Sequence, residues 1–282
     1  MTELEYKQLK DIQNVDLEMS VFFAGFCREN GLTCYLCGGG CIGAVRHGGF
    51  IPWDDDLDFF MPRDDYERLK QIWKEHERYA LLYPAETYND HNCFMTLRDK
   101  NTTMIKDYQR DLDTVHGIAI DIFPLDGYPS SKLKRLDQIF WGLLYQQYCA
   151  QLVPINHGRL VRFVGRFLLS AVPSAKNRYR IWRLAEKRMS RFRIKDCYYI
   201  TEICAGPHYM TKRYPKEIFS EAVYMPFEDK ELPVPVGYDT YLRIAFGDYM
   251  TLPPEEERVP GHKAVITDPS KPYHTYIEEY HG

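Results

Sequence analysis

The chain carries Leu36-Cys-Gly-Gly-Gly-Cys-Ile-Gly-Ala-Val-Arg-His47, followed at once by Ile51-Pro-Trp-Asp-Asp-Asp-Leu-Asp58. The first stretch holds a glycine turn of the kind that cradles a phosphate, and the second holds carboxylates of the kind that bind a divalent metal. Because the two stretches are separated by only a few residues, together they predict a site for phosphoryl-transfer chemistry.

The carboxylates lead into an apolar, aromatic-rich segment that ends at Pro62 and is typical of a buried strand. Side chains alternate across a strand, so we expect Asp56 and Asp58 on one face and Asp55 pointing away. Neighbouring carboxylates repel each other in a partly desolvated site, and Mg²⁺ or Mn²⁺ would resolve that conflict. An isolated acidic run is more often a solvated loop. Here its position between a glycine turn and a hydrophobic strand favours a metal site.

The glycine turn follows a predicted strand at Thr33 to Cys37. The run Gly38 to Gly40 can adopt positive φ and lets a phosphate oxygen approach the backbone N–H groups closely. A short helix is expected from Cys41 to His47, and its N-terminal donors favour an anion. Three glycines alone could be only a tight turn, but the acidic strand beside them strengthens the phosphate interpretation.

A third carboxylate is predicted in Gly117-Ile-Ala-Ile-Asp-Ile-Phe-Pro-Leu-Asp-Gly127, an apolar strand with Asp121 at its centre. A buried Asp on such a strand is costly unless it is paired or metal-bound. Asp121 is therefore the candidate that completes the metal site, whereas Asp126 beside Gly127 is typical of a turn.

Five motifs together carry a family resemblance. They are Gly39-Gly-Cys-Ile-Gly-Ala-Val-Arg-His47, Ile51-Pro-Trp-Asp-Asp-Asp-Leu-Asp58, Arg63-Asp-Asp-Tyr66, Asp121-Ile-Phe-Pro124 and Tyr249-Met-Thr-Leu-Pro-Pro254. In this combination the chain resembles the LicD family of phosphocholine transferases, which also includes the fukutin-related sugar-phosphate transferases. The resemblance extends from about Leu36 to His262, and the first two motifs are its most specific part.

The resemblance implies a nucleotidyltransferase-like fold, in which Gly39 and Gly40 form the turn and Asp56, Asp58 and Asp121 hold the metal. It also implies transfer of a phospho-alcohol, with phosphocholine as first candidate, from a CDP-activated donor such as CDP-choline. The implied acceptor is a hydroxyl of a bacterial cell-surface glycan, namely a lipopolysaccharide or teichoic-acid precursor, and CMP is released.

The chain departs from the family at position 40. Many members resemble Gly-Thr-Leu-Leu-Gly at the turn, whereas this chain has Gly40 where a hydroxyl could bond a phosphate. Nucleotide contacts there must therefore come from backbone groups, which leaves the identity of the donor open.

Further candidates flank these motifs. Either Arg46 or Arg63 is predicted to offset charge on the transferred phosphoryl group, although an ion pair with a nearby Asp is the alternative for Arg63. His47, Trp53 and Asp54 join the two glycines as predicted substrate-binding residues. If the cargo is choline, its ammonium needs an aromatic surface, and Trp53 is the first candidate, with burial in the core as its alternative.

The 282 residues, 45% hydrophobic and 27% charged, are ordinary for a globular protein of one large or two modest domains. The fold class that the resemblance implies is α+β, with a mixed sheet flanked by helices. A boundary is expected at Pro129-Ser-Ser131. Residues 1–130 would form the catalytic core. Residues 131–282 would form a mainly helical, acceptor-binding or membrane-proximal half, ending in an irregular strap from Tyr249 to His262 that returns to the site.

Residues 159–195 contain twelve Lys or Arg and a single acid, Glu186. The apolar spacing predicts one helix from 159 to 172 and a second from 177 to 194. A basic amphipathic pair can lie on an anionic membrane surface, and packing on the catalytic core is the equal alternative. No recognised nucleic-acid module accompanies the charge, so nucleic acid is not an expected partner.

The chain lacks the roughly 20 uninterrupted apolar residues of a spanning helix, and its acidic start is unlike a signal peptide. We therefore expect a cytoplasmic enzyme, with peripheral contact at the inner face of the membrane as an open possibility. The eight cysteines are then reduced thiols. Cys34, Cys37 and Cys41 are expected to pack rather than bind zinc or an iron–sulfur cluster, because Cys34 and Cys37 differ in parity on the predicted strand and Cys41 lies beyond the glycine turn.

Local patterns predict three more helices. One runs from about Thr2 to Asn30 with Gly31 at its C-terminal cap, one opens with Asp64 as N-cap, and one spans Asp239 to Phe246. Further strands are expected near Asn92 to Arg98 and Met104 to Tyr108.

Two rival functions share these features. A nucleotidyltransferase would use the same turn and carboxylates to attack the α-phosphate of an NTP. A non-catalytic nucleotide-binding protein would tolerate loss of the aspartates.

Overall fold

The computed structural model describes residues 2–153, 158–261 and 264–276. These residues divide into two compact units, each assembled from segments distant in the sequence. Apart from the positions outside the description, the first unit takes in Met1–Leu82, Thr96–Ile122 and Glu217–Gly282. The second takes in Tyr83–Met95 and Phe123–Lys216. The functional boundary expected near residue 130 stays a prediction.

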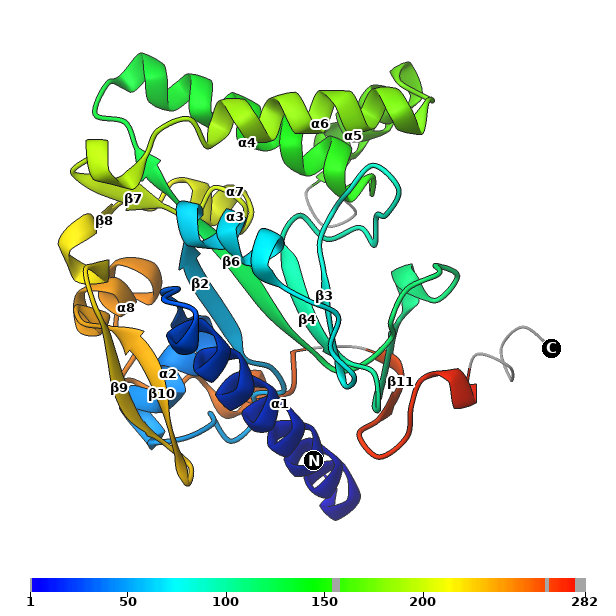
Figure 1. Cartoon of the computed structure of the whole chain (residues 1–282), viewed down its shortest axis with the longest axis vertical. Coiled ribbons are helices and arrows are strands. Elements are labelled where there is room, and N and C mark those ends of the chain that lie inside the picture. The colour runs from blue at the N-terminus through cyan, green and yellow to red at the C-terminus, as the bar shows by residue number, and fades with distance from the viewer. Residues whose placement is uncertain (1, 154–157, 262–263, 277–282) are drawn as a thin grey trace. The chain divides into compact units, whose positions relative to one another are not determined.

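The strands of the central sheet follow the order β1-β2-β6-β4-β3 (Figure 1). Their bounds are β1 Tyr35–Cys37, β2 Asp58–Pro62, β6 Ala119–Tyr128, β4 Met95–Asp99 and β3 Tyr79–Leu82. β1 and β2 pair antiparallel, with Cys37 opposite Asp58. Because β2 and β6 are neighbours, the sheet brings the two strands that carry Asp58 and Asp121 side by side.

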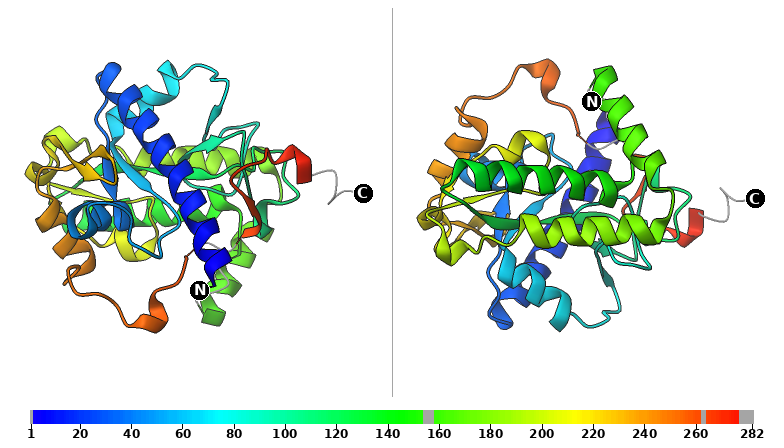
Figure 2. Two further views of the ribbon diagram at one scale, coloured as in Figure 1. Left: turned by 90° about the horizontal axis from the view of Figure 1, so that it is seen from below. Right: turned by 90° about the horizontal axis from the view of Figure 1, so that it is seen from above.

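Helix α1 (Glu3–Glu29) covers one face of this sheet, and Figure 2 shows it crossing the strands. It begins with a capping box between Thr2 and Glu5. Its Phe23 packs on Phe59 of β2, with 5.1 Å between ring centroids. The next residue of β2, Phe60, points to the opposite face and packs on Tyr241 of α8 (Tyr238–Phe246), because side chains alternate along a strand.

Several shorter elements complete the first unit. They are α2 Gly38–His47, α3 Arg63–Ile72, β5 Thr103–Lys106, β9 Ala222–Phe227, β10 Lys230–Pro235 and β11 Ala264–Asp268. β9 and β10 form an antiparallel hairpin, and β11 pairs antiparallel with β5.

The second unit is built on three helices, α4 Lys132–Ala150, α5 Gly158–Ala171 and α6 Ala175–Met189. Trp182 of α6 and Tyr145 of α4 lie edge to face in its core, with 6.0 Å between ring centroids. The last residues of β6 pair here with β7 (Tyr199–Thr201), which pairs in turn with β8 (Tyr214–Pro215). The short helix α7 (Pro207–Met210) lies between β7 and β8 in sequence.

The α+β class, the long N-terminal helix, the two basic helices and the helix ending before Gly247 are confirmed. The mainly helical half after residue 130 is not confirmed, because five strands, β7 to β11, accompany its helices. The predicted Asp64 cap is wrong. The N-cap position lies two residues earlier, at Pro62, so α3 begins at Arg63, with no side-chain cap bond. Asp65 in its first turn accepts a hydrogen bond from Thr33 N–H.

All eight cysteines are buried, and none of them is paired in a disulfide. In the part of the chain that the structure describes, no helix is both long and apolar enough to cross a membrane.

Candidate active site

The acidic run Asp54 to Asp56 lies in a loop, and β2 begins only at Asp58. One carboxylate oxygen from each of Asp54, Asp55 and Asp56 lies within 4.8 Å of the others, a spacing that could hold a metal ion. The expectation that Asp55 points away is therefore wrong. Strict alternation requires extended β geometry, and a loop can turn three consecutive side chains toward one region.

Hydrogen bonds within the loop and from distant segments hold this loop in place. The amide Nε2 of Gln13 on α1 donates to the Asp54 carbonyl at 2.7 Å, and Asp54 N–H donates to the Ile51 carbonyl at 2.9 Å. From the C-terminal side, Gly261 N–H donates to Asp55 Oδ1 at 3.2 Å. The strap after Tyr249 thus returns to the acidic run, as predicted, although His262 itself lies outside the described residues.

Asp58 belongs to the same electrostatic cluster. Burial raises its pKa well above the usual range, and the charge of Asp56 is the next largest cause. Asp121 and Asp54 raise this pKa further, whereas Lys106 on β5 lowers it. The structure therefore brings the predicted metal residues Asp56, Asp58 and Asp121 within electrostatic range of one another.

The glycine run touches this cluster directly. Gly39 has no side chain, and a Cβ there would overlap the Asp54 carboxylate, while a Cβ on Gly38 would lie 3.8 Å from Asp58 Oδ2. Gly38 has a φ of +54°, which favours glycine, and its N–H donates to Tyr241 Oη at 3.0 Å.

The helix after β1 begins at Gly38 rather than at Cys41 as expected, so the glycines form the first turn of α2. Gly40 packs between Leu57 and Leu36, where a Cβ would lie 3.0 and 3.2 Å from their methyl groups. The N–H groups of a first helical turn have no intrahelical acceptor, and at this end of α2 Gly38 and Gly39 lie against the carboxylate cluster.

Arg46 and His47 lie at the other end of α2. At 1.5 Å rise per residue, the backbone of Arg46 stands about 10 Å along the axis from Gly39. Arg46 Nη1 donates to the Tyr249 carbonyl at 2.6 Å, and its Nε bonds His47 Nε2 at 2.9 Å. Burial, followed by the charge of Arg46, lowers the pKa of His47. The predicted phosphoryl contact of Arg46 remains a prediction.

Arg63 opens α3 and is largely buried. Its Nη1 pairs with Glu67 at 3.3 Å, and its guanidinium lies over the Tyr66 ring at 5.3 Å. Among its contacts is thus a Glu on its own helix. Its predicted phosphoryl role, like that of Arg46, stays a prediction.

Trp53 precedes the acidic run and carries the Arg258 guanidinium over its ring, 5.6 Å from the centroid. Arg258 and Asp55 also line a cavity of about 630 Å³ whose other walls come from α1, β5, β11 and the strap. Apolar side chains dominate those walls, including Leu9, Ile12 and Met104. The cavity adjoins the acidic run and offers space for a substrate.

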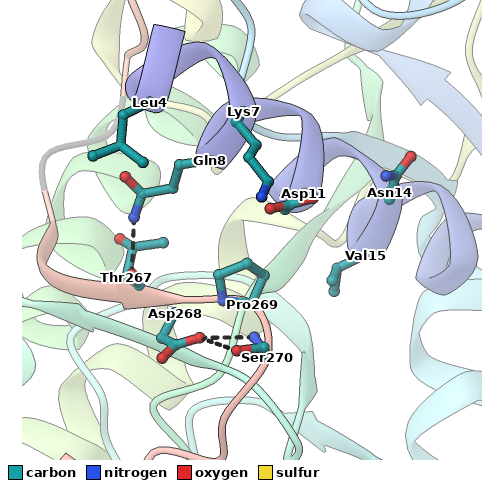
Figure 3. Close-up of a pocket in the computed structure, with 10 residues that line it drawn as sticks. All are labelled: Leu4, Lys7, Gln8, Asp11, Asn14, Val15, Thr267, Asp268, Pro269 and Ser270. Carbon is teal, nitrogen blue, oxygen red and sulfur yellow. Dashed lines mark hydrogen bonds between the residues drawn. The ribbon is translucent and has the colours of Figure 1, made fainter. Parts of the chain in front are cut away.

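A second hollow lies between α1 and the turn after β11 (Figure 3). Gln8 Nε2 donates to the Thr267 carbonyl across it at 2.9 Å, and Asp268 bonds Ser270 within the turn. The acidic cluster contributes nothing to its lining, so we do not place chemistry there.

Four residues at the site escaped the sequence reasoning: Gln13, Asp16, Lys106 and Tyr241. Asp16 is the most informative, because it is fully buried on α1. Burial, followed by the charges of Asp56 and Asp55, raises its pKa well above the usual range. One feature could have revealed it: a single charge interrupting the apolar stripe of Ile12, Met19 and Phe23.

Comparisons with known proteins found a family model and several relatives that this chain resembles. The family model described as LicD/FKTN/FKRP, nucleotidyltransferase domain, matches residues 31–168, which include every carboxylate of the cluster except Asp16. The lipopolysaccharide cholinephosphotransferase LicD of Haemophilus influenzae is 30% identical over 265 residues, covering 90% of this chain and 96% of that protein. An uncharacterized protein of Rickettsia typhi is 27% identical over 114 residues, covering 40% of this chain and 35% of that protein. One of Rickettsia prowazekii is 38% identical over 63 residues, covering 22% of this chain and 23% of that protein.

Proposed function

Because the chain belongs to the LicD family, we propose that it transfers phosphocholine, or a related phospho-alcohol, from a CDP-activated donor to a glycan hydroxyl. The acceptor would be a precursor of a cell-surface glycan, lipopolysaccharide or teichoic acid, and CMP would leave. The observation that carries this proposal is the carboxylate cluster packed against the glycine start of α2, with Gly39 against Asp54.

The donor set fits a hard divalent cation. Asp54, Asp56, Asp58 and Asp121 offer only oxygen ligands, and after burial the charges of the other three carboxylates raise the pKa of Asp58, a repulsion that a bound cation would relieve. Asp56, Asp58 and Asp121 would hold the cation, with Asp54 beside them. Mg²⁺ or Mn²⁺, once bound, would neutralise diphosphate charge and polarise the transferred phosphoryl group.

The protein's own groups would position the donor. N–H groups in the first turn of α2 would bind phosphate oxygens, and Gly39 and Gly40 leave the backbone open to that approach. Lys106, close enough to Asp58 to lower its pKa, would offset negative charge at the same place. Arg46 and Arg63 remain candidates for that task, and His47 remains a candidate substrate contact.

The chemical step would form one P–O bond and break another. The acceptor hydroxyl oxygen attacks the phosphorus that carries choline, the bond from that phosphorus to the CMP oxygen breaks, and a carboxylate of the cluster accepts the hydroxyl proton. Trp53 would contact the choline ammonium. That its ring already holds the Arg258 guanidinium at 5.6 Å supports this role, because the same π face suits either cation.

We also propose that the second unit rests on an anionic membrane at the cytoplasmic face. Phe163 and Phe167 on α5 are 69% and 62% exposed, and each is directly preceded in sequence by an arginine, Arg162 and Arg166. Exposed aromatic rings beside cations suit a headgroup interface. A lipid-linked acceptor would then meet the enzyme at the surface where it is held.

The decisive experiment incubates the purified protein with Mg²⁺ and a panel of CDP-choline, CDP-glycerol and CDP-ribitol, and measures CMP. Release of CMP that requires both the cation and one CDP-alcohol supports the proposal. Pyrophosphate release from ATP or CTP would instead indicate a nucleotidyltransferase. Nucleotide binding by calorimetry without turnover of any donor, with or without glycan acceptor, would indicate a non-catalytic protein.

A further inference from the structure

One face of α1 carries buried polar atoms that have no hydrogen-bond partner within the described residues. They are Oε1 of Gln13, both carboxylate oxygens of Asp16 and Oγ of Ser20. The spacing of three and four residues places them on a single helix face. Asp16 and Ser20 are 0% exposed. Buried polar groups are normally satisfied, so three neighbouring exceptions indicate that something polar binds at this face.

This face of α1 is directed at the acidic run. The other end of the Gln13 side chain, Nε2, donates to the Asp54 carbonyl at 2.7 Å. The charges that act on Asp16 are, from largest to smallest, those of Asp56, Asp55, Asp54 and Asp121. A carboxylate buried among other carboxylates is costly unless a cation or a proton compensates it.

We propose that Asp16 belongs to a second cation position, on the α1 side of the acidic run, formed with Asp54, Asp55 and Asp56. The three loop carboxylates already present one oxygen each within 4.8 Å of one another, and Asp16 adds a buried carboxylate with both oxygens available. Its ligand is a hard divalent cation, Mg²⁺ or Mn²⁺, because every donor is oxygen.

Charge balance favours two cations over one. The cluster holds the carboxylates of Asp54, Asp55, Asp56, Asp58, Asp121 and Asp16. One divalent ion shared by Asp56, Asp58 and Asp121 would leave the α1 side uncompensated. Asp56 appears among the charges acting on both Asp16 and Asp58, so it links the two positions. The inference rests on the proposed function only for the kind of cation involved.

Titration with Mn²⁺, followed by the loss of its free EPR signal, tests the idea without turnover. We expect the wild-type chain to bind two Mn²⁺ and Asp16→Asn to bind one, or to bind the second at least about tenfold more weakly. Asp11→Asn is the matched control, since it removes an exposed carboxylate from the same helix, and it should bind two. Unchanged stoichiometry and affinity in Asp16→Asn would overturn the proposal.

Thermal unfolding supplies a second readout whose sign separates the alternatives. In EDTA, Asp16→Asn should unfold at a higher temperature than wild type, because a buried uncompensated charge is gone, whereas the stabilisation by Mn²⁺ should shrink. A merely structural Asp16 would give a lower melting temperature both with and without Mn²⁺.

Asp58→Asn keeps the proposal testable if Asp16→Asn does not fold. It should retain one Mn²⁺ at the α1 position, and loss of both ions would contradict a separate position. Failure of the wild-type chain to bind any Mn²⁺ would count against the proposed metal dependence itself, and is thus distinguishable from a failure that concerns Asp16 alone.

Discussion

Gly39 and Asp54 are packed so closely that position 39 can carry no side chain while the Asp54 carboxylate keeps its place. This contact ties the first turn of α2 to the acidic run. It gives a physical reason for glycine here besides phosphate access: a Cβ would occupy the volume of a carboxylate oxygen.

Gly39→Ala should therefore displace Asp54 and impair the site. We expect little change in the free energy of unfolding, because the Cβ would meet only side-chain atoms of Asp54, which can turn aside, but at least tenfold slower CMP release because that carboxylate has moved. Chemical denaturation and the CMP assay measure both. Gly25→Ala on α1 is the control, because its Cβ would meet nothing within 4 Å. The free energy of unfolding of this control should rise by about 0.5–1 kcal/mol, and its activity should be unchanged. A Gly39→Ala protein that releases CMP as fast as wild type would contradict the prediction.

Asp58→Asn should abolish turnover without unfolding the protein. The residue is a predicted cation ligand whose pKa is raised by burial and by neighbouring carboxylates. Replacing it should slow CMP release on the order of 100- to 1000-fold or more, while the metal-free protein becomes more stable as repulsion is relieved. Activity assays and thermal unfolding in EDTA test both effects. Near-normal activity of Asp58→Asn would contradict the assignment of Asp58 as a cation ligand.

Glu202 should make the stability of the protein depend on pH. Burial raises its pKa from 4.5 to about 7, even though Tyr214 donates a hydrogen bond to its carboxylate. Above pH 4.5 the unfolded state releases a proton that the folded state still holds. The contribution of Glu202 to the free energy of unfolding is therefore fully present below pH 4.5. It is lost as pH rises through about 7, by about 3 kcal/mol in total.

Glu202→Gln should remove that dependence and be the more stable protein at pH 8. Urea unfolding at pH 5 and pH 8 measures the difference. Glu217→Gln, at an exposed position, is the control and should follow wild type at both pH values. If the free energy of unfolding changed with pH equally in wild type and Glu202→Gln, the pKa of this carboxyl would not be raised.

The exposed face of α5 should mediate membrane binding. Phe163→Ser combined with Phe167→Ser should reduce sedimentation with phosphatidylglycerol vesicles at least tenfold, because burying each ring contributes about 1.5–3 kcal/mol. Leu4→Ser, which also removes an exposed apolar side chain but from the first unit, should bind like wild type. If the wild-type protein did not bind anionic vesicles, the membrane proposal would be refuted, but the proposed phosphocholine transfer would not be affected.

Periodic segments were predictable from the sequence, and irregular ones were not. The apolar spacing of α1 and the glycine after α8 predicted both helices, because helix periodicity and capping act locally. The hairpin of β9 and β10 was missed. It turns at Glu228-Asp229, with Glu228 at a φ of +53°, instead of at the Asn or Gly usual for such turns, and its strands contain prolines.

The candidate site was predictable only where its residues lie in a local sequence motif. Asp54, Asp56, Asp58 and Asp121 follow from motifs, but Asp55 was misplaced because strand parity was applied to a loop. Asp16 and Lys106 reach the cluster through tertiary packing of α1 and β5. The apolar stripe of α1 could have indicated that Asp16 is buried, but no local pattern indicates which residues it faces.

The reactivity of the buried cysteines measures how often the structure around each of them opens. Cys37 and Cys41 bracket the glycine run, and burial raises the pKa of the Cys41 thiol, so neither should react with an alkylating reagent while this turn stays closed. Mass-resolved labelling over time would then report, cysteine by cysteine, how often each region exposes its interior. The labelling rate at Cys37 and Cys41, compared with that at Cys149 in the second unit, would reveal whether the glycine turn opens independently or only when the whole chain unfolds.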